Sequence, residues 1–136
     1  MADKHFKLEI ITPEKVVYSA DVEHVMAPGK NGYFGVKVNH IPFLTLLKIG
    51  ELTANSEKKE KLFAISGGIV EIADNKMTIL AETAEAATDI DVDRAKRARE
   101  RAEQRIKEKL AETNLTRARA SLMRAINRID VAAGSH

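Results

Sequence analysis

Residues 62–80 have the sequence Leu62-Phe63-Ala64-Ile65-Ser66-Gly67-Gly68-Ile69-Val70-Glu71-Ile72-Ala73-Asp74-Asn75-Lys76-Met77-Thr78-Ile79-Leu80. The stretch holds three short apolar runs, 62–65, 69–72 and 77–80, which are separated by Ser66-Gly67-Gly68 and by Asp74-Asn75. Short runs rich in β-branched residues that end at such turn signals are typical of β-strands. The stretch therefore predicts three consecutive strands.

The same pattern of short runs and turns continues back to residue 6. Turn signals lie at Thr12–Lys15, at Pro28-Gly29, at Gly50 and over the polar stretch 55–61. Because no helical period lies between them, this part of the chain predicts a small antiparallel β-sandwich or barrel. Its apolar runs are Phe6–Ile10, Val16–Tyr18, Val22–Met26, Leu44–Lys48 and Leu52–Ala54.

From Asp91 onward the apolar residues follow a helical period. Asp91 is a good N-cap, and Asp93 places an acid in the first turn, where the helix dipole favours it. Two stripes with helical spacing follow, and Thr113-Asn114 interrupts them, so we expect an antiparallel pair of helices, the first about 20 residues long. The stripes are Val92, Ala95, Ala98, Ala102, Ile106 and Leu110, then Leu115, Ala118, Leu122, Ala125 and Ile129.

The charges change at the same place as the period. Residues 1–89 contain ten Lys, no Arg and 13 acids, whereas residues 90–136 contain three Lys, nine Arg and seven acids. Such a break favours two modules. The predicted fold class is α+β: an N-terminal antiparallel β-sandwich over residues 1–86, followed by a linker and a C-terminal two-helix hairpin over residues 87–136.

Alanine dominates the predicted seam between the two helices. An alanine methyl buries little, about 0.8 kcal/mol against roughly 2–3 kcal/mol for a leucine side chain. A weakly held hairpin suits a conformational switch, because a switch needs a gap of only a few kcal/mol. The same composition also fits a permanently closed, close-packed hairpin, and the sequence leaves both interpretations open.

The arginines divide into two groups. Antiparallel pairing brings the start of the first helix beside the end of the second, so Arg94, Arg101, Arg124 and Arg128 can gather near the open end of the hairpin. Clustered guanidinium groups are suited to binding phosphate or carboxylate. The other five fit a solvated face interleaved with acids, namely Arg97, Arg99, Arg105, Arg117 and Arg119.

Several classes of function find no support in the sequence. The chain has no cysteine, and the spacing of its histidines His5, His24, His40 and His136 does not suit metal ligation. Gly29, Gly32 and Gly35 open no helix and lack a following Lys-Ser/Thr, so they are turn glycines rather than a phosphate-binding loop. No apolar run approaches the about 20 residues of a membrane span, which predicts a soluble chain. No set of Ser, His and acid suggests a nucleophile, so the first module suits a scaffold and docking surface rather than an enzyme.

Motifs along the whole chain resemble those of one family, the epsilon subunits of bacterial rotary ATP synthases. Within that family, the segment 90–95 resembles the Ile/Leu-Asp-x-x-Arg-Ala motif of the ATP-binding, bacillus-like members. The matching segments are Ile11-Thr12-Pro13-Glu14, Ala27-Pro28-Gly29, Gly32-Tyr33-Phe34-Gly35-Val36, Asn39-His40-Ile41-Pro42-Phe43-Leu44-Thr45, Ser66-Gly67-Gly68-Ile69-Val70-Glu71-Ile72 and Ile90-Asp91-Val92-Asp93-Arg94-Ala95.

The resemblance implies a regulatory and coupling role in the rotor. The sandwich would bind the gamma subunit and rest against the polar loops of the c-ring. The hairpin would fold down on the sandwich when ATP binds, or extend toward the catalytic alpha and beta subunits and inhibit ATP hydrolysis. The chain would then be a peripheral membrane protein on the cytoplasmic face of the bacterial cell membrane.

The resemblance also implies a nucleotide site. Ile90, Asp91 and Ala95 would contribute to the adenosine side, and Glu85 would contact the adenine. The ribose or phosphates would be bound by Arg94, Arg101, Arg124 and Arg128. ATP would be a regulatory ligand, bound with or without Mg²⁺, and no cofactor would be required.

Two other functions stay open on the sequence. The first is a free-standing nucleotide sensor of the same fold without a rotor partner. The second is a basic hairpin that binds nucleic acid, which is less favoured because no aromatic residue follows Phe63 to stack bases and because acids dilute the positive field. We therefore expect no nucleic-acid partner.

Overall fold

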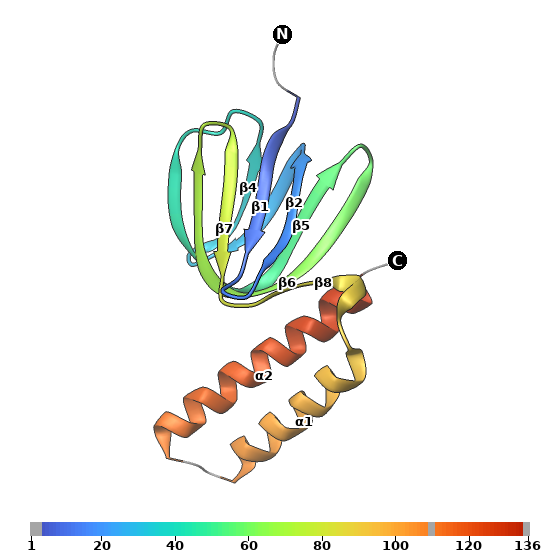
Figure 1. The fold of residues 1–136 in the computed structure, drawn as a ribbon. Helices are drawn as coiled ribbons and strands as arrows, with labels where there is room; N and C mark the ends of the chain where they lie inside the picture. The colour runs from blue at the N-terminus through green and yellow to red at the C-terminus, as the bar shows by residue number, and fades with distance from the viewer. Residues whose placement is uncertain (1–3, 109–110, 135–136) are drawn as a thin grey trace.

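The computed structural model describes residues 4–108 and 111–134, and it confirms a β-sandwich followed by two helices (Figure 1). Leu110 and His136 lie outside the described residues. The strands are β1 (Phe6–Ile11), β2 (Val16–Val22), β3 (His24–Gly29), β4 (Gly32–Lys37), β5 (Phe43–Ser56), β6 (Lys59–Ala73), β7 (Lys76–Ala81) and β8 (Ala84–Ala86); the short 3-10 helix η1 (Ala87–Asp89) and the α-helices α1 (Val92–Lys107) and α2 (Glu112–Ala133) follow.

Strands β5 and β6 are long and continuous, whereas the sequence predicted four short strands there. They pair from Phe43 opposite Ile72 to Ser56 opposite Lys59, so the predicted breaks at Gly50 and at 66–68 are wrong. Gly50 is present because the chain packs closely there and not because the strand turns: a Cβ on Gly50 would lie 2.5 Å from the Pro28 Cβ. Glycine in a strand can mark such a close approach rather than a turn.

Two other predicted boundaries in the sandwich are wrong. Strand β3 continues through Gly29, and the turn lies at residues 30–31 rather than at Pro28-Gly29. The predicted strand 22–26 is divided at Glu23, between β2 and β3. The turn at Asp74-Asn75 and the hairpin tip within 55–61 are confirmed, since β5 ends at Ser56 and β6 begins at Lys59.

The strands follow the order β2-β1-β7-β6-β5-β3-β4, and β8 pairs with β6. One pair departs from the antiparallel prediction: β1 and β7 are parallel, with Ile11 opposite Leu80. The Lys76 Nζ lies 2.6 Å from the Glu9 Oε1 across this pair. A largely aliphatic core fills the sandwich, with Leu8, Ile10, Leu52, Ile65 and Ile79 fully buried, and Phe6 and Phe63 are buried in it as well.

The two helices pack side by side through alanine, as predicted. Ala95, Ala102, Ala118 and Ala125 are only 1–2% exposed, whereas Ala98 is half-buried. Helix α1 has 16 residues, shorter than predicted. Helix α2 begins at Glu112, so Thr113-Asn114 lies in its first turn. The predicted break between the two helices at these residues is therefore wrong.

The hairpin lies against one end of the sandwich, with α2 nearer to the strands than α1 (Figure 1). The Asn127 side-chain amide donates hydrogen bonds to the Gly50 carbonyl at 2.9 Å and to the Ile65 carbonyl at 3.5 Å. One turn later, the fully buried Val131 packs in a small cluster with Ala64, Ala87 and Ile90. The structure is therefore the folded-down arrangement of the two modules.

Candidate functional site

A cavity of about 580 Å³ lies where the sandwich meets the hairpin. We call it the junction cavity. Its lining includes Thr12–Lys15 between β1 and β2, the segment 82–85, and the first turn of α1. Six residues of the predicted nucleotide site line it, namely Glu85, Ile90, Asp91, Arg94, Ala95 and Arg128.

The chain between β8 and α1 positions the residues of the predicted motif. Helix η1 turns the chain away from the sheet, and Ile90 then packs in the small cluster with Val131. Asp91 follows as the N-cap of α1, and its Oδ1 accepts a hydrogen bond from the Arg94 N–H at 3.0 Å. An extended N-cap residue whose carboxylate accepts from N3 fixes where the helix begins. The cap thus places Arg94 and Ala95 at the cavity wall.

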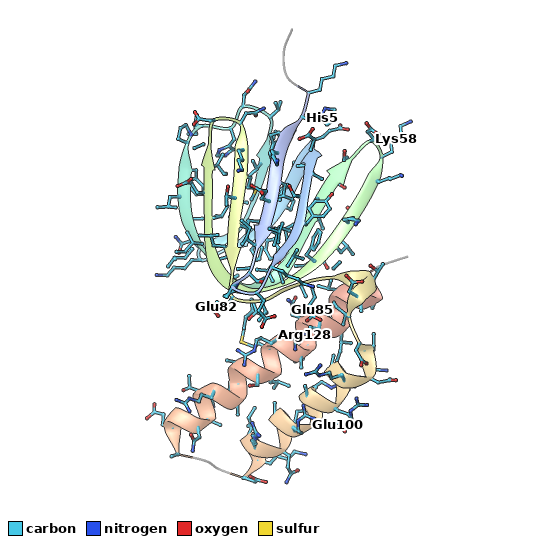
Figure 2. The ribbon with its side chains drawn as sticks, in the orientation of Figure 1. His5, Lys58, Glu82, Glu85, Glu100 and Arg128 are labelled. Atoms are coloured by element: carbon cyan, nitrogen blue, oxygen red, sulfur yellow. The ribbon has the colours of Figure 1, made fainter. Side chains whose placement is uncertain are left out.

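An ion pair joins the two modules at this cavity. The Arg128 Nε of α2 donates to the Glu85 Oε1 of β8 at 2.6 Å, and the two side chains are 32% and 36% exposed. In Figure 2, Glu85 and Arg128 lie together at the end of the sandwich that faces α2, near Glu82. Glu85, predicted as an adenine contact, is therefore paired with one of the predicted phosphate ligands in this structure.

A second hollow, of about 170 Å³, lies between α1 and α2. It is lined by Arg101 and Arg105 from α1 and by Arg124 and Arg128 from α2. We call it the arginine groove. The four predicted arginines thus divide between two adjoining spaces, with Arg94 in the junction cavity, Arg101 and Arg124 in the groove, and Arg128 in both. Arg105 is exposed, as the sequence predicted, yet it also lines the groove.

The two spaces differ in charge. The junction cavity is lined by Glu14, Glu82, Glu85, Asp89 and Asp91, against Lys15, Arg94 and Arg128. Among the described residues, no carboxylate lines the arginine groove. The groove therefore suits an anion, whereas the junction cavity suits an uncharged group that accepts and donates hydrogen bonds.

No local sequence signal predicted the sandwich side of the junction cavity. Thr12–Lys15 follows β1, and the segment from Glu82 follows β7. Because β1 and β7 are parallel, the carboxyl ends of both strands lie at the same end of the sheet, which brings the two segments together. Parallel pairing between strands so distant in the chain has no local sequence pattern.

An apolar row crosses the outer face of the sheet. Leu46, Ile69 and Leu80 lie opposite one another on β5, β6 and β7, and Ile11 of β1 continues the row beside Leu80. Leu46, Ile69 and Leu80 are 43–53% exposed, and together with Pro13 and Ile11 they line an open hollow. Contiguous exposed apolar surface of this kind often marks an interaction site.

The described residues contain no group of three or more His, Cys, Asp or Glu side chains arranged to hold a metal ion. None of their helices is both long enough and apolar enough to cross a membrane.

Two family models match the chain, one after the other. The model for "ATP synthase, Delta/Epsilon chain, beta-sandwich domain" matches residues 5–87, and the model for "ATP synthase, Delta/Epsilon chain, long alpha-helix domain" matches residues 88–133. Together with the fold, they define the class of ATP synthase delta/epsilon chains.

Curated relatives narrow the class. A relative from Nitratidesulfovibrio vulgaris (strain DP4) is 48% identical over 95% of this chain and 96% of its own length. One from Syntrophobacter fumaroxidans is 52% identical over 97% and 98%, and one from Bacillus licheniformis is 42% identical over 95% and 98%. Each is named ATP synthase epsilon chain. The chain belongs to the family of bacterial ATP synthase epsilon chains, non-catalytic subunits of that complex.

Solved structures share the fold. A chain in the Euglena gracilis mitochondrial ATP synthase (OSCP/F1/c-ring) superposes with a TM-score of 0.78 at 20% identity, covering 90% of this chain and 78% of the other. A chain in the Tetrahymena thermophila mitochondrial ATP synthase (central stalk/c-ring) gives a TM-score of 0.55 at 21% identity, covering 68% and 73%.

Proposed function

We propose that this epsilon chain couples and regulates the rotor of its ATP synthase, with ATP binding at the junction of its two modules. The sandwich docks on the gamma subunit and rests against the polar loops of the c-ring, which makes the chain a peripheral membrane protein on the cytoplasmic face of the cell membrane. The hairpin folds down when ATP is bound. When extended toward the alpha and beta subunits, it inhibits ATP hydrolysis.

The observation that carries the nucleotide part is the junction cavity. Its volume of about 580 Å³ falls within the about 300–1,000 Å³ typical of small-molecule sites. Residues of both modules line it, so the site exists only when the hairpin is folded down. A ligand that binds one of two conformations shifts the population toward it. ATP at this junction would thereby hold the folded-down form.

The charges support one orientation of ATP. The five carboxylates of the junction cavity disfavour a triphosphate there, so adenosine occupies that space and the phosphates enter the arginine groove. Arg128 lines both spaces and meets the ligand where they join. Its Nε pairs with Glu85, so ATP either displaces that carboxylate or uses the remaining N–H groups of the guanidinium.

Binding by arginines has two chemical consequences. Guanidinium groups neutralise the phosphates, so Mg²⁺ is accepted but not required. No hydrolysis is expected, because phosphoryl transfer relies on metal ions and on a group that positions the attacking water. ATP is thus a regulatory ligand and not a substrate of this chain.

Isothermal titration with ATP tests the nucleotide part. We expect Arg94→Ala and Arg128→Ala each to weaken binding by about 1.5–3 kcal/mol, the range for hydrogen bonds to charged groups. The control is Arg117→Ala, an exposed arginine of α2 outside both spaces. ATP should also raise the unfolding temperature of the wild type as the logarithm of its concentration. Absence of both heat and thermal shift at millimolar ATP would refute the nucleotide part and leave the family membership intact.

The apolar row supports the docking part. An acid in its centre, Ile69→Asp, would place a charge in the interface and should abolish co-purification with gamma. Met123→Asp on α2 is the matched control, since Met123 is 55% exposed but lies on the hairpin. Retained co-purification of Ile69→Asp would place the gamma interface elsewhere. ATP binding by a wild type that never co-purifies with gamma would instead favour the free-standing nucleotide sensor.

A further inference from the structure

One peptide group of the sandwich is bound by a side chain on each of its two sides. It joins Gly50 to Glu51 on β5. The Glu51 N–H donates a hydrogen bond to the Tyr33 hydroxyl oxygen at 2.9 Å, and the Gly50 carbonyl accepts one from the Asn127 side-chain amide at 2.9 Å. Tyr33 lies on β4, which ends the strand order of the sheet, and Asn127 lies on α2. A single peptide group therefore connects an edge strand of the sandwich to the hairpin.

Glycine at position 50 makes room for the Tyr33 hydroxyl. The ladder between β3 and β5 is irregular at this point, because residues 48–52 of β5 face only residues 27–28 of β3, and the Glu51 N–H is bound there by a side chain instead. A Cβ on Gly50 would lie 2.7 Å from the Tyr33 hydroxyl oxygen, too close for the hydroxyl to stay in place. The absence of a side chain at residue 50 thus permits the hydrogen bond between Glu51 and Tyr33.

The two hydrogen bonds of this peptide group depend on each other. Because of resonance, a donor at the carbonyl oxygen withdraws electron density from the nitrogen, so the N–H becomes a stronger donor. Docking of Asn127 on the Gly50 carbonyl therefore strengthens the bond from Glu51 to Tyr33, and by reciprocity the bond to Tyr33 strengthens the docking. Tyr33 is 52% exposed and lines neither the junction cavity nor the arginine groove, so this connection is separate from the proposed ATP site.

We propose that Tyr33 is a positioning residue for the hairpin: its hydroxyl, acting through the Gly50–Glu51 peptide group, favours the folded-down form. We call this connection the peptide link. The proposal rests on the proposed function in one respect, the existence of an extended form. It adds a residue that belongs neither to the apolar row nor to the ATP site. It also makes the edge strand β4 a place from which a contact on the sandwich changes the position of the hairpin.

A double-mutant cycle in the full chain without ATP tests the peptide link. The FRET distance between the sandwich and Leu122 measures the ratio of folded-down to extended hairpin. Tyr33→Phe removes only the hydroxyl and keeps the ring, and it should lower this ratio about two- to fivefold. In the Asn127→Ala background the same substitution should lower the ratio less than about 1.5-fold, because the bond to the carbonyl is already lost. The matched control is Tyr18→Phe, which removes the other tyrosine hydroxyl, on β2, and should leave the ratio unchanged.

Nuclear magnetic resonance tests the peptide link without relying on an extended form. Tyr33→Phe should shift the side-chain amide resonances of Asn127 more than Tyr18→Phe does. Asn127→Ala should shift the Glu51 N–H resonance more than Asn114→Ala, which removes an exposed amide from α2. An equal effect of Tyr33→Phe on the ratio with and without Asn127 would overturn the proposal, as would Asn127 resonances that do not move. A wild type that shows a single folded-down distance under all conditions refutes the extended form in the proposed function, and the shift at Asn127 then supports or overturns the link alone.

Discussion

At the residue scale, Gly32 and Gly68 form a natural comparison. Both adopt a left-handed backbone, with φ of +131° and +137°. A Cβ on Gly32 would meet nothing within 4 Å, whereas a Cβ on Gly68 would lie 2.2 Å from the Leu80 carbonyl oxygen and 2.8 Å from the Ala81 Cα. Backbone atoms of β7 cannot move aside as a flexible side chain can. Gly68 is thus required by both conformation and space.

We expect Gly32→Ala to cost about 1–3 kcal/mol of unfolding free energy from backbone strain alone. Gly68→Ala should cost at least about 1–3 kcal/mol more, because overpacking is added to the same strain. Urea unfolding of both variants measures the difference. If the two variants lose the same stability, the close approach of β6 and β7 does not determine the need for glycine at position 68.

Glu51 gives a second prediction at this scale. It is half-buried on β5, and burial raises the pKa of its carboxyl above the ordinary 4.5, with the negative charges of Glu60 and Asp130 raising it further. The stability that a raised pKa provides is fully present below the unfolded pKa and is lost as pH rises through the folded pKa. At neutral pH, the ionised Glu51 carboxylate on β5 repels the Asp130 carboxylate on α2, and it therefore opposes the packing of α2 against β5.

Glu51→Gln should consequently stabilise the protein at pH 7, by less than about 1 kcal/mol because the group is only half-buried. The gain should shrink as pH falls through the folded and then the unfolded pKa, and it should vanish near pH 3, where the wild-type carboxyl is protonated in both states. Urea unfolding at the two pH values measures it. Glu100→Gln, which removes an exposed acid of α1, is the control and should leave stability unchanged at both. A wild type more stable than Glu51→Gln at pH 7 would contradict the assignment.

At the scale of elements, the alanine seam sets how closely α1 and α2 approach. Ala125 is 1% exposed, so a leucine there has no room without moving a helix. We expect Ala125→Leu to cost about 1–3 kcal/mol and to shift the hairpin toward an open form. Ala133→Leu makes the same change at an exposed position of α2. A FRET distance between the sandwich and Leu122 reports the shift, and a more tightly closed Ala125→Leu would show that the seam has slack.

Local sequence signals predicted the type and order of the elements more accurately than the residues at which each element begins and ends. The periods of two and of 3.6 residues correctly predicted a sandwich before a helical hairpin, and Asp91 marked the start of α1. Gly50 and 66–68 were misread as turns, since glycine that ends a strand and glycine that allows another chain to approach have the same local pattern. The start of α2 was misplaced because Thr and Asn at 113–114 are tolerated in a first turn.

At the scale of the whole molecule, the sequence predicted only the part of the candidate site that depends on local helical spacing. Helical spacing brought Arg94, Arg101, Arg124 and Arg128 to one end of the hairpin, and the structure divides them between two adjoining spaces. The contribution of Thr12–Lys15 depends on the parallel pairing of β1 with β7 and was missed. The ion pair between Glu85 and Arg128 depends on how the modules dock, which no periodicity encodes.

The two modules also differ in what stabilises them. The main core cluster lies wholly within the sandwich, from Phe6 to Ala84, whereas the described residues of the hairpin contribute Val131 to the small cluster. Removing the hairpin would expose Leu62 and Ala64 of the small cluster and the carbonyls of Gly50 and Ile65, which water can satisfy. Residues 1–86 thus retain the core that a folded domain requires.

We therefore predict that a chain truncated after Ala86 folds, binds gamma and supports coupling in proton-pumping membranes, but binds no ATP. The apolar row that we propose for gamma lies entirely on β1, β5, β6 and β7, whereas α1 and α2 supply every arginine. Circular dichroism and urea unfolding establish that the truncated chain is folded before gamma is added. Ile69→Asp in the truncated chain should then abolish capture by gamma. A folded truncated chain that fails to bind gamma would place the docking surface on the hairpin. The prediction that the sandwich binds gamma and the hairpin binds ATP, each as a separate module, would then be wrong.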